Sequence, residues 1–230
     1  MSEDALPQPG PPVLEATGIS KTFRRGPEVV RALAGVDLAI DPGEVVGLTG
    51  PSGSGKTTLL NVLCGWEMPD EGTIRFRGTA ISSPARLPWR DLAIVAQDLA
   101  LMGELSVEEN VALPLRLEPT IARGTEVGAL LELLGIDALA PRLPEEASLG
   151  EQQRAAVARA LLVEPHVLLA DEPVGHQDEE WTKVVMQAIR DRAAGGMACL
   201  ITTHDRETWS YLDRIVTLRD GVVARASEPR

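Results

Sequence analysis

Residues 50–57 read Gly50-Pro51-Ser52-Gly53-Ser54-Gly55-Lys56-Thr57 and match the pattern G-x-x-x-x-G-K-[ST] at every constrained position. This pattern binds the phosphates of a nucleotide when a strand precedes it and a helix follows it. Its glycines let the backbone curl, so that consecutive N–H groups point at one compact anion. The sequence therefore predicts a polyphosphate site at this loop.

The residues on both sides of the loop have the required character. Glu44–Thr49 is a short apolar run typical of a buried strand, and a helix from about Lys56 to Cys64 is expected to stop at Gly65. The N-terminus of that helix carries about half a unit of positive charge. We expect Lys56 to bridge the β- and γ-phosphates and the Thr57 hydroxyl to take a Mg²⁺ coordination site. A glycine- and serine-rich loop without function is the alternative, and this setting argues against it.

Two adjacent acids close a second apolar strand. Val167–Ala170 is followed directly by Asp171 and Glu172. A buried strand has no reason to end in paired carboxylates unless a cation or a reacting group meets them. We expect Asp171 to hold Mg²⁺ and Glu172 to act as general base toward a water that attacks the γ-phosphate. The alternative is a solvated strand end.

A histidine follows a third apolar run. Ala198–Thr202 leads to His204, and ligands of open α/β sheets lie at the carboxyl ends of the strands. An isolated histidine in such a place is more often a structural hydrogen-bonding group than a catalytic one. Beside the other motifs, we expect His204 to contact the γ-phosphate.

The composition is that of an ordinary globular protein, with 44% hydrophobic, 24% charged and only 3% aromatic residues. The net charge of −12 disfavours direct binding to nucleic acid and to anionic lipid headgroups. No run reaches the ~18 apolar residues that span a bilayer. Membrane association is therefore expected to come through a protein partner. Cys64 and Cys199 are expected to be buried thiols rather than a disulfide or a metal site.

One domain over residues 13–225 is expected, an α/β core with an inserted helical lobe. Residues 1–12 are proline-rich and acidic and indicate a disordered lead. Capping boxes at Ser106 and Ser148, and a helical pattern over Glu126–Leu134, place the lobe at about 98–165. The core then comprises 13–97 and 166–225, with further strands expected at Val13–Thr17, Val29–Leu33, Val36–Ile40 and Thr73–Phe76 and a helix from about Glu179 to Ala193.

In this order, the motifs resemble the ATP-binding cassette (ABC) family from Val13 to Val223. Three more stretches add to the resemblance: Ile94-Val-Ala-Gln97 is similar to the loop whose glutamine touches Mg²⁺, Ser148-Leu-Gly-Glu-Gln-Gln-Arg154 to the signature motif, and Gly175-His-Gln-Asp178 to the loop that crosses the dimer interface. Phe23 falls where the family stacks an aromatic ring on adenine, although a phenylalanine there could equally fill the core. The resemblance implies these roles: ATP binding by Phe23, Gly50, Pro51, Ser52, Gly53, Ser54, Gly55, Lys56, Thr57, Thr58 and Gln97; metal binding by Thr57, Gln97 and Asp171; catalysis by Glu172, His204 and Lys56; contact with the partner's ATP by Ser148, Gly150 and Glu151; and a dimer loop at Asp178.

The fold implied by the resemblance is α/β, a P-loop NTPase (RecA-like) core with an antiparallel β subdomain and an inserted α-helical subdomain. The implied activity is ATP hydrolysis with ATP and Mg²⁺, in a subunit that pairs with a second ATP-binding subunit, identical or different, and drives transmembrane permease subunits from the cytoplasmic side of the cell membrane. Contact with the permease is expected at a cleft around Gln97 to Val111, including Leu99, Leu101, Met102 and Leu105. Asn110-Val-Ala-Leu-Pro-Leu115 resembles the branch that serves lipoprotein release, macrolide export and cell division. The ATPase subunit does not touch the cargo, so no residue encodes it.

Two motifs depart from the family pattern. Leu149 stands at the first glycine of the signature, which would cost ~1 kcal/mol or more if the position needs φ > 0 or close backbone approach, so we expect weakened pairing of subunits. His176 and Gln177 replace the usual Asn-Leu, which favours pairing with a different subunit. Two other functions stay open: a low-turnover ATP-dependent clamp on a membrane complex, and an ABC protein that acts on nucleic acid.

Overall fold

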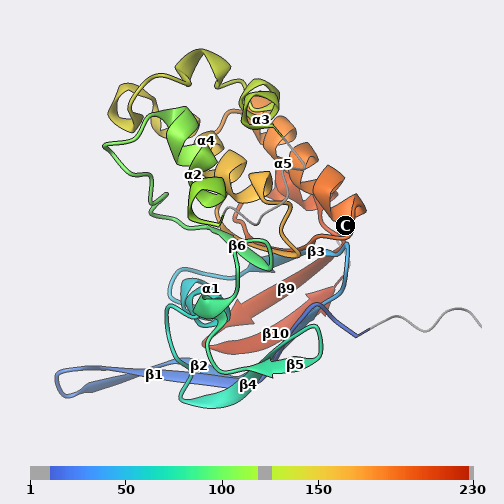
Figure 1. Ribbon diagram of the computed structural model, residues 1–230. Coiled ribbons are helices and arrows are strands. Elements are labelled where there is room, and N and C mark those ends of the chain that lie inside the picture. The colour runs from blue at the N-terminus through green and yellow to red at the C-terminus, as the bar shows by residue number, and fades with distance from the viewer. Residues whose placement is uncertain (1–10, 119–125, 228–230) are drawn as a thin grey trace, which may run out of the picture.

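Two sheets and five α-helices organise the part of the protein that the structure describes (Figure 1). The computed structural model describes residues 11–118 and 126–227, so the lead expected at 1–12 lies almost wholly outside it. Figure 1 shows helices α2 to α5 on one side of the larger sheet and the smaller sheet on the other.

The smaller sheet is antiparallel, in the order β2-β1-β4-β5. Two separate strands were expected at 29–33 and 36–40, and this is wrong, because one long strand runs through both with Gly35 at φ 74° and irregular pairing to β1 between Ala16 and Thr22. Alternating side chains that face the core continue the strand across that irregularity. The strands are β1 (Leu14–Arg25), β2 (Glu28–Ile40), β4 (Glu71–Phe76) and β5 (Thr79–Ile81).

The larger sheet has the order β10-β9-β3-β8-β7-β6, and every neighbouring pair except β9 with β10 is parallel. Because β3, β8 and β7 are adjacent and parallel, their carboxyl ends share one edge, where the candidate residues follow the strands. The strands are β3 (Val45–Thr49), β6 (Leu92–Val95), β7 (Val167–Asp171), β8 (Ala198–Thr202), β9 (Arg214–Arg219) and β10 (Val222–Ser227).

Successive residues of β7 pack into two different hydrophobic cores. Leu168 and Ala170 join the core beneath α4 and α5, whereas Val167 and Leu169 join the core shared with α1 and the antiparallel sheet. A strand that is covered on both faces needs apolar residues at every position, which explains its unbroken apolar sequence.

The helices begin and end where the sequence indicates. Ser106 and Ser148 both form complete capping boxes, at the start of α2 and of α4, and Gly65 closes α1 in a left-handed conformation. The α-helices are α1 (Lys56–Cys64), α2 (Val107–Leu117), α3 (Val127–Leu133), α4 (Leu149–Leu162) and α5 (Glu179–Ala194); short 3₁₀ helices lie at Pro84–Arg86, Asp137–Leu139, Pro144–Glu146 and Arg206–Tyr211.

Both cysteines are buried free thiols, as expected. Over residues 11–118 and 126–227, none of the helices combines the length and the apolar character that crossing a membrane requires.

Candidate active site

The phosphate loop joins β3 to α1, and its backbone accepts only glycine at two positions. Gly50 has φ 146°, and a Cβ there would lie 2.1 Å from the Leu218 carbonyl oxygen. Gly55 has φ 105°, and a Cβ there would lie 2.4 Å from the Ala32 carbonyl oxygen. The buried Ser54 anchors the loop from within, since its carbonyl accepts a hydrogen bond from the Gly221 N–H at 3.1 Å. The sequence pattern therefore reflects close packing of the loop against its neighbours.

Lys56 lies over the loop that it follows. Its side chain is only 8% exposed, and its Nζ donates to the carbonyl oxygens of Gly50 at 2.8 Å and Pro51 at 3.2 Å. A cation held by backbone carbonyls at the mouth of an amide-lined loop gives the loop positive potential. The exposed Pro51, Ser52 and Gly53 complete the rim, and Thr58 follows in the first turn of α1.

The structure brings the oxygens of two of the three predicted metal ligands together. The Thr57 hydroxyl donates to Asp171 Oδ2 at 3.2 Å, across 114 positions of sequence. The other oxygen of Asp171 accepts a hydrogen bond from the Thr202 hydroxyl. Asp171 is 8% exposed, so two hydroxyls fix the orientation of a nearly buried carboxylate.

Glu172 and His204 also meet at this edge. His204 Nε2 lies 3.0 Å from Glu172 Oε1, and both side chains are partly open to solvent. Glu172 has φ 50°, a left-handed conformation that costs a residue other than glycine about 1–3 kcal/mol. The surrounding chain must therefore hold this conformation.

A cavity of about 750 Å³ opens beside the loop and contains Phe23. Phe23 is half-buried, belongs to neither hydrophobic core, and has Lys21 Nζ 5.3 Å from its ring centroid. The cavity is also lined by Arg24 and Arg31, two cations that the sequence analysis did not single out, together with Gly53, Gly55, Lys56, Thr57 and Thr58.

The signature turn starts α4 with an acidic capping box. Glu151 Oε2 accepts hydrogen bonds from the Ser148 hydroxyl and the Ser148 N–H, each at 2.7 Å, and these bonds lower the pKa of the Glu151 carboxyl. Leu149 is the first helical residue, 49% exposed, and its φ is not positive. A positive φ, the first condition for backbone strain at Leu149, is therefore not met, because a residue at the start of a helix needs no left-handed conformation.

Gly150 is partly buried and packs against the loop at 175–178. A Cβ on Gly150 would lie 2.8 Å from the His176 carbonyl oxygen, so the 175–178 loop rests directly on the signature turn. Asp178 caps α5, since its Oδ1 accepts a hydrogen bond from the Trp181 N–H at 2.9 Å. Gln97 lies two residues beyond β6 and is exposed, and it makes no hydrogen bond to other described residues. The structure thus assembles the phosphate loop, Asp171, Glu172 and His204, whereas Gln97 makes no hydrogen bond to any of them.

The profile of the ABC transporter family matches residues 33–175, most of the stretch that carries these motifs. The chain belongs to the ABC transporter family. It is 41% identical over 219 residues to the lipoprotein-releasing system ATP-binding protein LolD 1 of Rhodospirillum rubrum, covering 90% of this chain and 96% of the relative. It is 37% identical to the macrolide export ATP-binding/permease protein MacB of an Azoarcus species, covering 96% of this chain and 35% of the relative.

A solved structure gives the same result for the fold of this ABC cassette. The dimeric post-hydrolysis state of the ATP-binding cassette MJ0796, bound to ADP and Pi, superposes with a TM-score of 0.86 at 30% identity, over 94% of this chain and 99% of that one. The fold class inferred from sequence is confirmed. The chain is an ATP-binding and ATP-hydrolysing subunit of an ABC transporter, which works with transmembrane subunits and a second ATP-binding subunit.

The ABC cassette also has site residues that sequence reasoning missed. Thr202 contacts both acids, because its hydroxyl donates to Asp171 and accepts from the Glu172 N–H. Gln153, in α4, donates to the Glu172 carbonyl at 2.6 Å. A signal for Thr202 existed, since it closes a strand beside the one that ends in Asp171, whereas nothing in the signature motif indicates which way Gln153 points.

Proposed function

We propose that ATP binds between the phosphate loop of this chain and the signature turn of a second ATP-binding subunit, and that Glu172 activates the hydrolytic water. The observation that carries this proposal is the convergence of Thr57 on Asp171 and of His204 on Glu172 at one sheet edge. Four motif residues that follow three different strands thus form two contacting pairs. The signature residues Ser148, Gly150 and Glu151 and the loop at Asp178 would face the partner's ATP.

Thr57 and Asp171 fit a magnesium ion. A hydroxyl and a carboxylate oxygen 3.2 Å apart are oxygen donors of the kind that Mg²⁺ takes, and Mg²⁺ is usually bound by one or two carboxylates plus substrate phosphates. The described residues contain no group of three or more His, Cys, Asp or Glu side chains that could hold a metal. When bound, Mg²⁺ supplies charge that offsets the negative charge of the β- and γ-phosphates. Gln97 is proposed as a further ligand after the loop moves toward Asp171.

The chain's own residues then account for the chemistry. Glu172 accepts a proton from the water as its oxygen forms a bond to the γ-phosphorus, and the bond from that phosphorus to the bridging oxygen of ADP breaks. His204 orients the Glu172 carboxylate and reaches the γ-phosphate. Lys56, near the phosphate oxygens, stabilises the charge that develops there.

Phe23 is proposed to stack on adenine. It lines the cavity that also contains Lys56 and Thr58, and it packs in neither core, which argues against core filling. Arg24 and Arg31 lie in the same cavity and add positive potential to a chain that is acidic overall.

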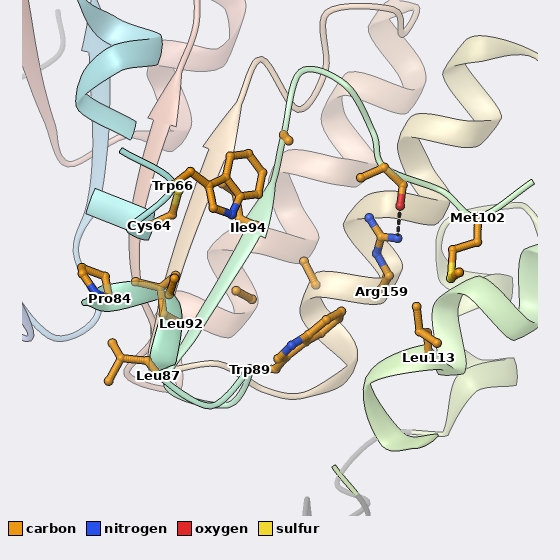
Figure 2. A pocket seen from close by; sticks show the side chains of 15 residues that line it. Cys64, Trp66, Pro84, Leu87, Trp89, Leu92, Ile94, Met102, Leu113 and Arg159 are labelled. Carbon is orange, nitrogen blue, oxygen red and sulfur yellow. Dashed lines mark hydrogen bonds between the residues drawn. The ribbon is translucent and has the colours of Figure 1, made fainter. Parts of the chain in front are cut away.

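The permease subunits are proposed to dock in a groove lined mostly by apolar residues, at the inner face of the membrane. The groove has a volume of about 390 Å³, and Figure 2 shows Cys64 and Pro84 on one side of it and Met102 and Leu113 on the other. The fusion of ATP-binding and permease parts in MacB supports a permease segment as the occupant. Of the four residues expected to line this cleft, Met102 alone lines the groove. The expectation for Leu99 is wrong, because Leu99 is 9% exposed in the core and its carbonyl accepts a hydrogen bond from Arg159.

Two tryptophans line the groove that should receive the permease. Trp66 is 56% exposed, and Trp89 is half-buried against the core. Trp66→Ala is expected to reduce co-purification with the permease without changing the ATPase rate of the isolated chain. Leu133→Ala serves as control, because Leu133 is 52% exposed and lies outside the groove. Equal recovery of permease by both variants would contradict the docking proposal.

Phosphate release with Mg²⁺ and ATP tests the catalytic proposal. Glu172→Gln is expected to lower the rate ~10²–10⁴-fold while ATP still binds, and Lys56→Ala to abolish tight nucleotide binding. Lys183→Ala is the matched control, because that lysine is exposed on α5 and forms an ion pair with Glu179. Equal release by wild type and Glu172→Gln would instead favour the low-turnover clamp. Recovery of RNA or DNA with the purified chain, in place of a membrane protein, would favour a role on nucleic acid.

A further inference from the structure

The backbone of Glu172 is held from both sides by side chains. Its N–H donates to the Thr202 hydroxyl at 2.9 Å, and its carbonyl accepts from Gln153 Nε2 at 2.6 Å. These bonds come from different elements, since Thr202 closes β8 and Gln153 lies in the second turn of α4. A left-handed φ of 50° persists only where neighbours fix it, so both contacts act on the aim of the carboxylate.

Gln153 has a single possible amide orientation. Its Oε1 accepts from the His176 N–H at 3.2 Å, while its Nε2 donates to the Glu172 carbonyl. Exchanging the two ends would set the amide oxygen against a carbonyl oxygen and the NH₂ group against an N–H. Gln153 is 3% exposed, so water cannot replace either partner at low cost.

Gln177 holds Gln153 in this orientation and ties it to the signature turn. Gln177 Nε2 donates to Gln153 Oε1 at 3.1 Å and to the Gly150 carbonyl at 2.8 Å, and its Oε1 accepts from Arg154 Nη1 at 2.7 Å. Both the NH₂ group and the carbonyl oxygen of the Gln177 amide are thus hydrogen-bonded within the chain.

Arg154 is a rigid support for Gln177. Its guanidinium lies 4.1 Å from the ring centroid of Trp181, and desolvation lowers the pKa of the Arg154 guanidinium. Trp181 is itself confined, because a Cβ on Gly135 would lie 1.9 Å from its ring. The guanidinium therefore has little freedom to move away from Gln177.

We propose that Gln153 is a positioning residue for Glu172 and that Gln177 fixes Gln153, so that the carboxylate acting on this chain's ATP and the turn facing the partner's ATP move as one body. This inference rests on the proposed role of Glu172 as general base. Loss of Gln153 leaves the Glu172 carbonyl with the Gly175 N–H as its donor, at 3.1 Å, so the left-handed turn is held less firmly and the carboxylate spends less time in the reactive orientation. Misplacement of about 1 Å can cost a catalytic group ~10²-fold in rate.

The test is a double-mutant cycle on the turnover number. Gln153→Leu keeps the size of the side chain and removes its hydrogen bonds, and it is expected to lower kcat about 10–100-fold with KM for MgATP changed less than about threefold. In the Glu172→Gln background, the same change is expected to lower the residual rate less than about twofold, because its target is already disabled. Gln187→Leu is the control and is expected to match wild type, because this amide lies on α5 and, among the described residues, its side chain bonds Asp191 alone.

Gln177→Ala extends the test with a side chain nearer the surface, should Gln153→Leu fail to fold. It is expected to lower kcat about 3–10-fold in the wild-type background and not at all with Glu172→Gln. Equal losses in both backgrounds, or a rise in KM with kcat unchanged, would overturn the positioning role while leaving the base intact. Equal rates for wild type and Glu172→Gln would overturn both proposals, since Glu172 would then have no catalytic function to position.

Discussion

His204 Nε2 lies 3.0 Å from Glu172 Oε1, although 31 residues separate the two in sequence and each follows a different strand. The adjacency of β7 and β8 brings the two residues together, since Asp171 pairs in register with Thr202. The histidine therefore contacts the carboxylate assigned as base directly.

Replacing His204 should weaken catalysis through this contact. His204→Ala is expected to lower kcat about 10–100-fold, because Glu172 loses its orienting partner and the γ-phosphate loses a donor. His204→Gln keeps a hydrogen-bond donor and should retain more activity than His204→Ala. Steady-state phosphate release measures both, and equal activity of His204→Ala and wild type would contradict the role.

A methyl group on Gly150 should destabilise the protein. Its Cβ would lie 2.8 Å from the His176 carbonyl oxygen, so Gly150→Ala must displace the 175–178 loop, at about 1–3 kcal/mol. Gly128→Ala on α3 is the matched control, because a Cβ there meets nothing within 4 Å and should stabilise its helix by up to about 1 kcal/mol. Urea unfolding compares the two, and similar midpoints would show that the loop yields freely.

Leu149 should weaken pairing through its bulk and not through its backbone. Its side chain is 49% exposed at the start of α4 without positive φ. Leu149→Gly and Leu149→Ala are therefore both expected to shift the dependence of ATPase rate on protein concentration toward lower concentrations. A shift for glycine alone would restore the strain explanation, and curves that match wild type for both variants would remove the effect altogether.

Burial of Cys64 should make stability fall at alkaline pH. Desolvation raises the pKa of this thiol from 9.0 to about 11, so the folded protein keeps a proton that the unfolded chain loses above pH 9. The stabilisation is complete below pH 9 and is lost as pH rises toward 11, with a slope of up to about 1.4 kcal/mol per pH unit. Between pH 8.5 and 10.5 under reducing conditions, the free energy of unfolding of wild type should fall by about 1–2 kcal/mol more than that of Cys64→Ala. Parallel pH profiles would contradict this expectation.

The sequence alone predicts the parts of the site that depend on local pattern. The loop at 50–57 has its glycines because of backbone geometry within a few residues, and Asp171 ends an apolar strand whose direction is set by the sheet. Strands β6, β9 and β10 were not foreseen, since they are short or carry charges, and tertiary pairing holds them in the sheet.

Contacts between distant elements are what sequence reasoning could not supply. The departure at Gln177 suggested a different partner subunit, yet inside this chain the side chain bonds Gly150, Gln153 and Arg154. The groove expected around 97–111 owes much of its lining to Trp66 and Trp89, because residues from other segments fold against it.

The alternation of β7 between two cores ties the length of this strand to the aim of its last residue. Since neighbouring positions face opposite layers, inserting or deleting one residue would exchange the contents of both cores and turn Asp171 away from Thr57. Only changes by an even number keep both arrangements. The length of this strand therefore obeys a parity rule, which the contact between Asp171 and Thr57 at its end enforces.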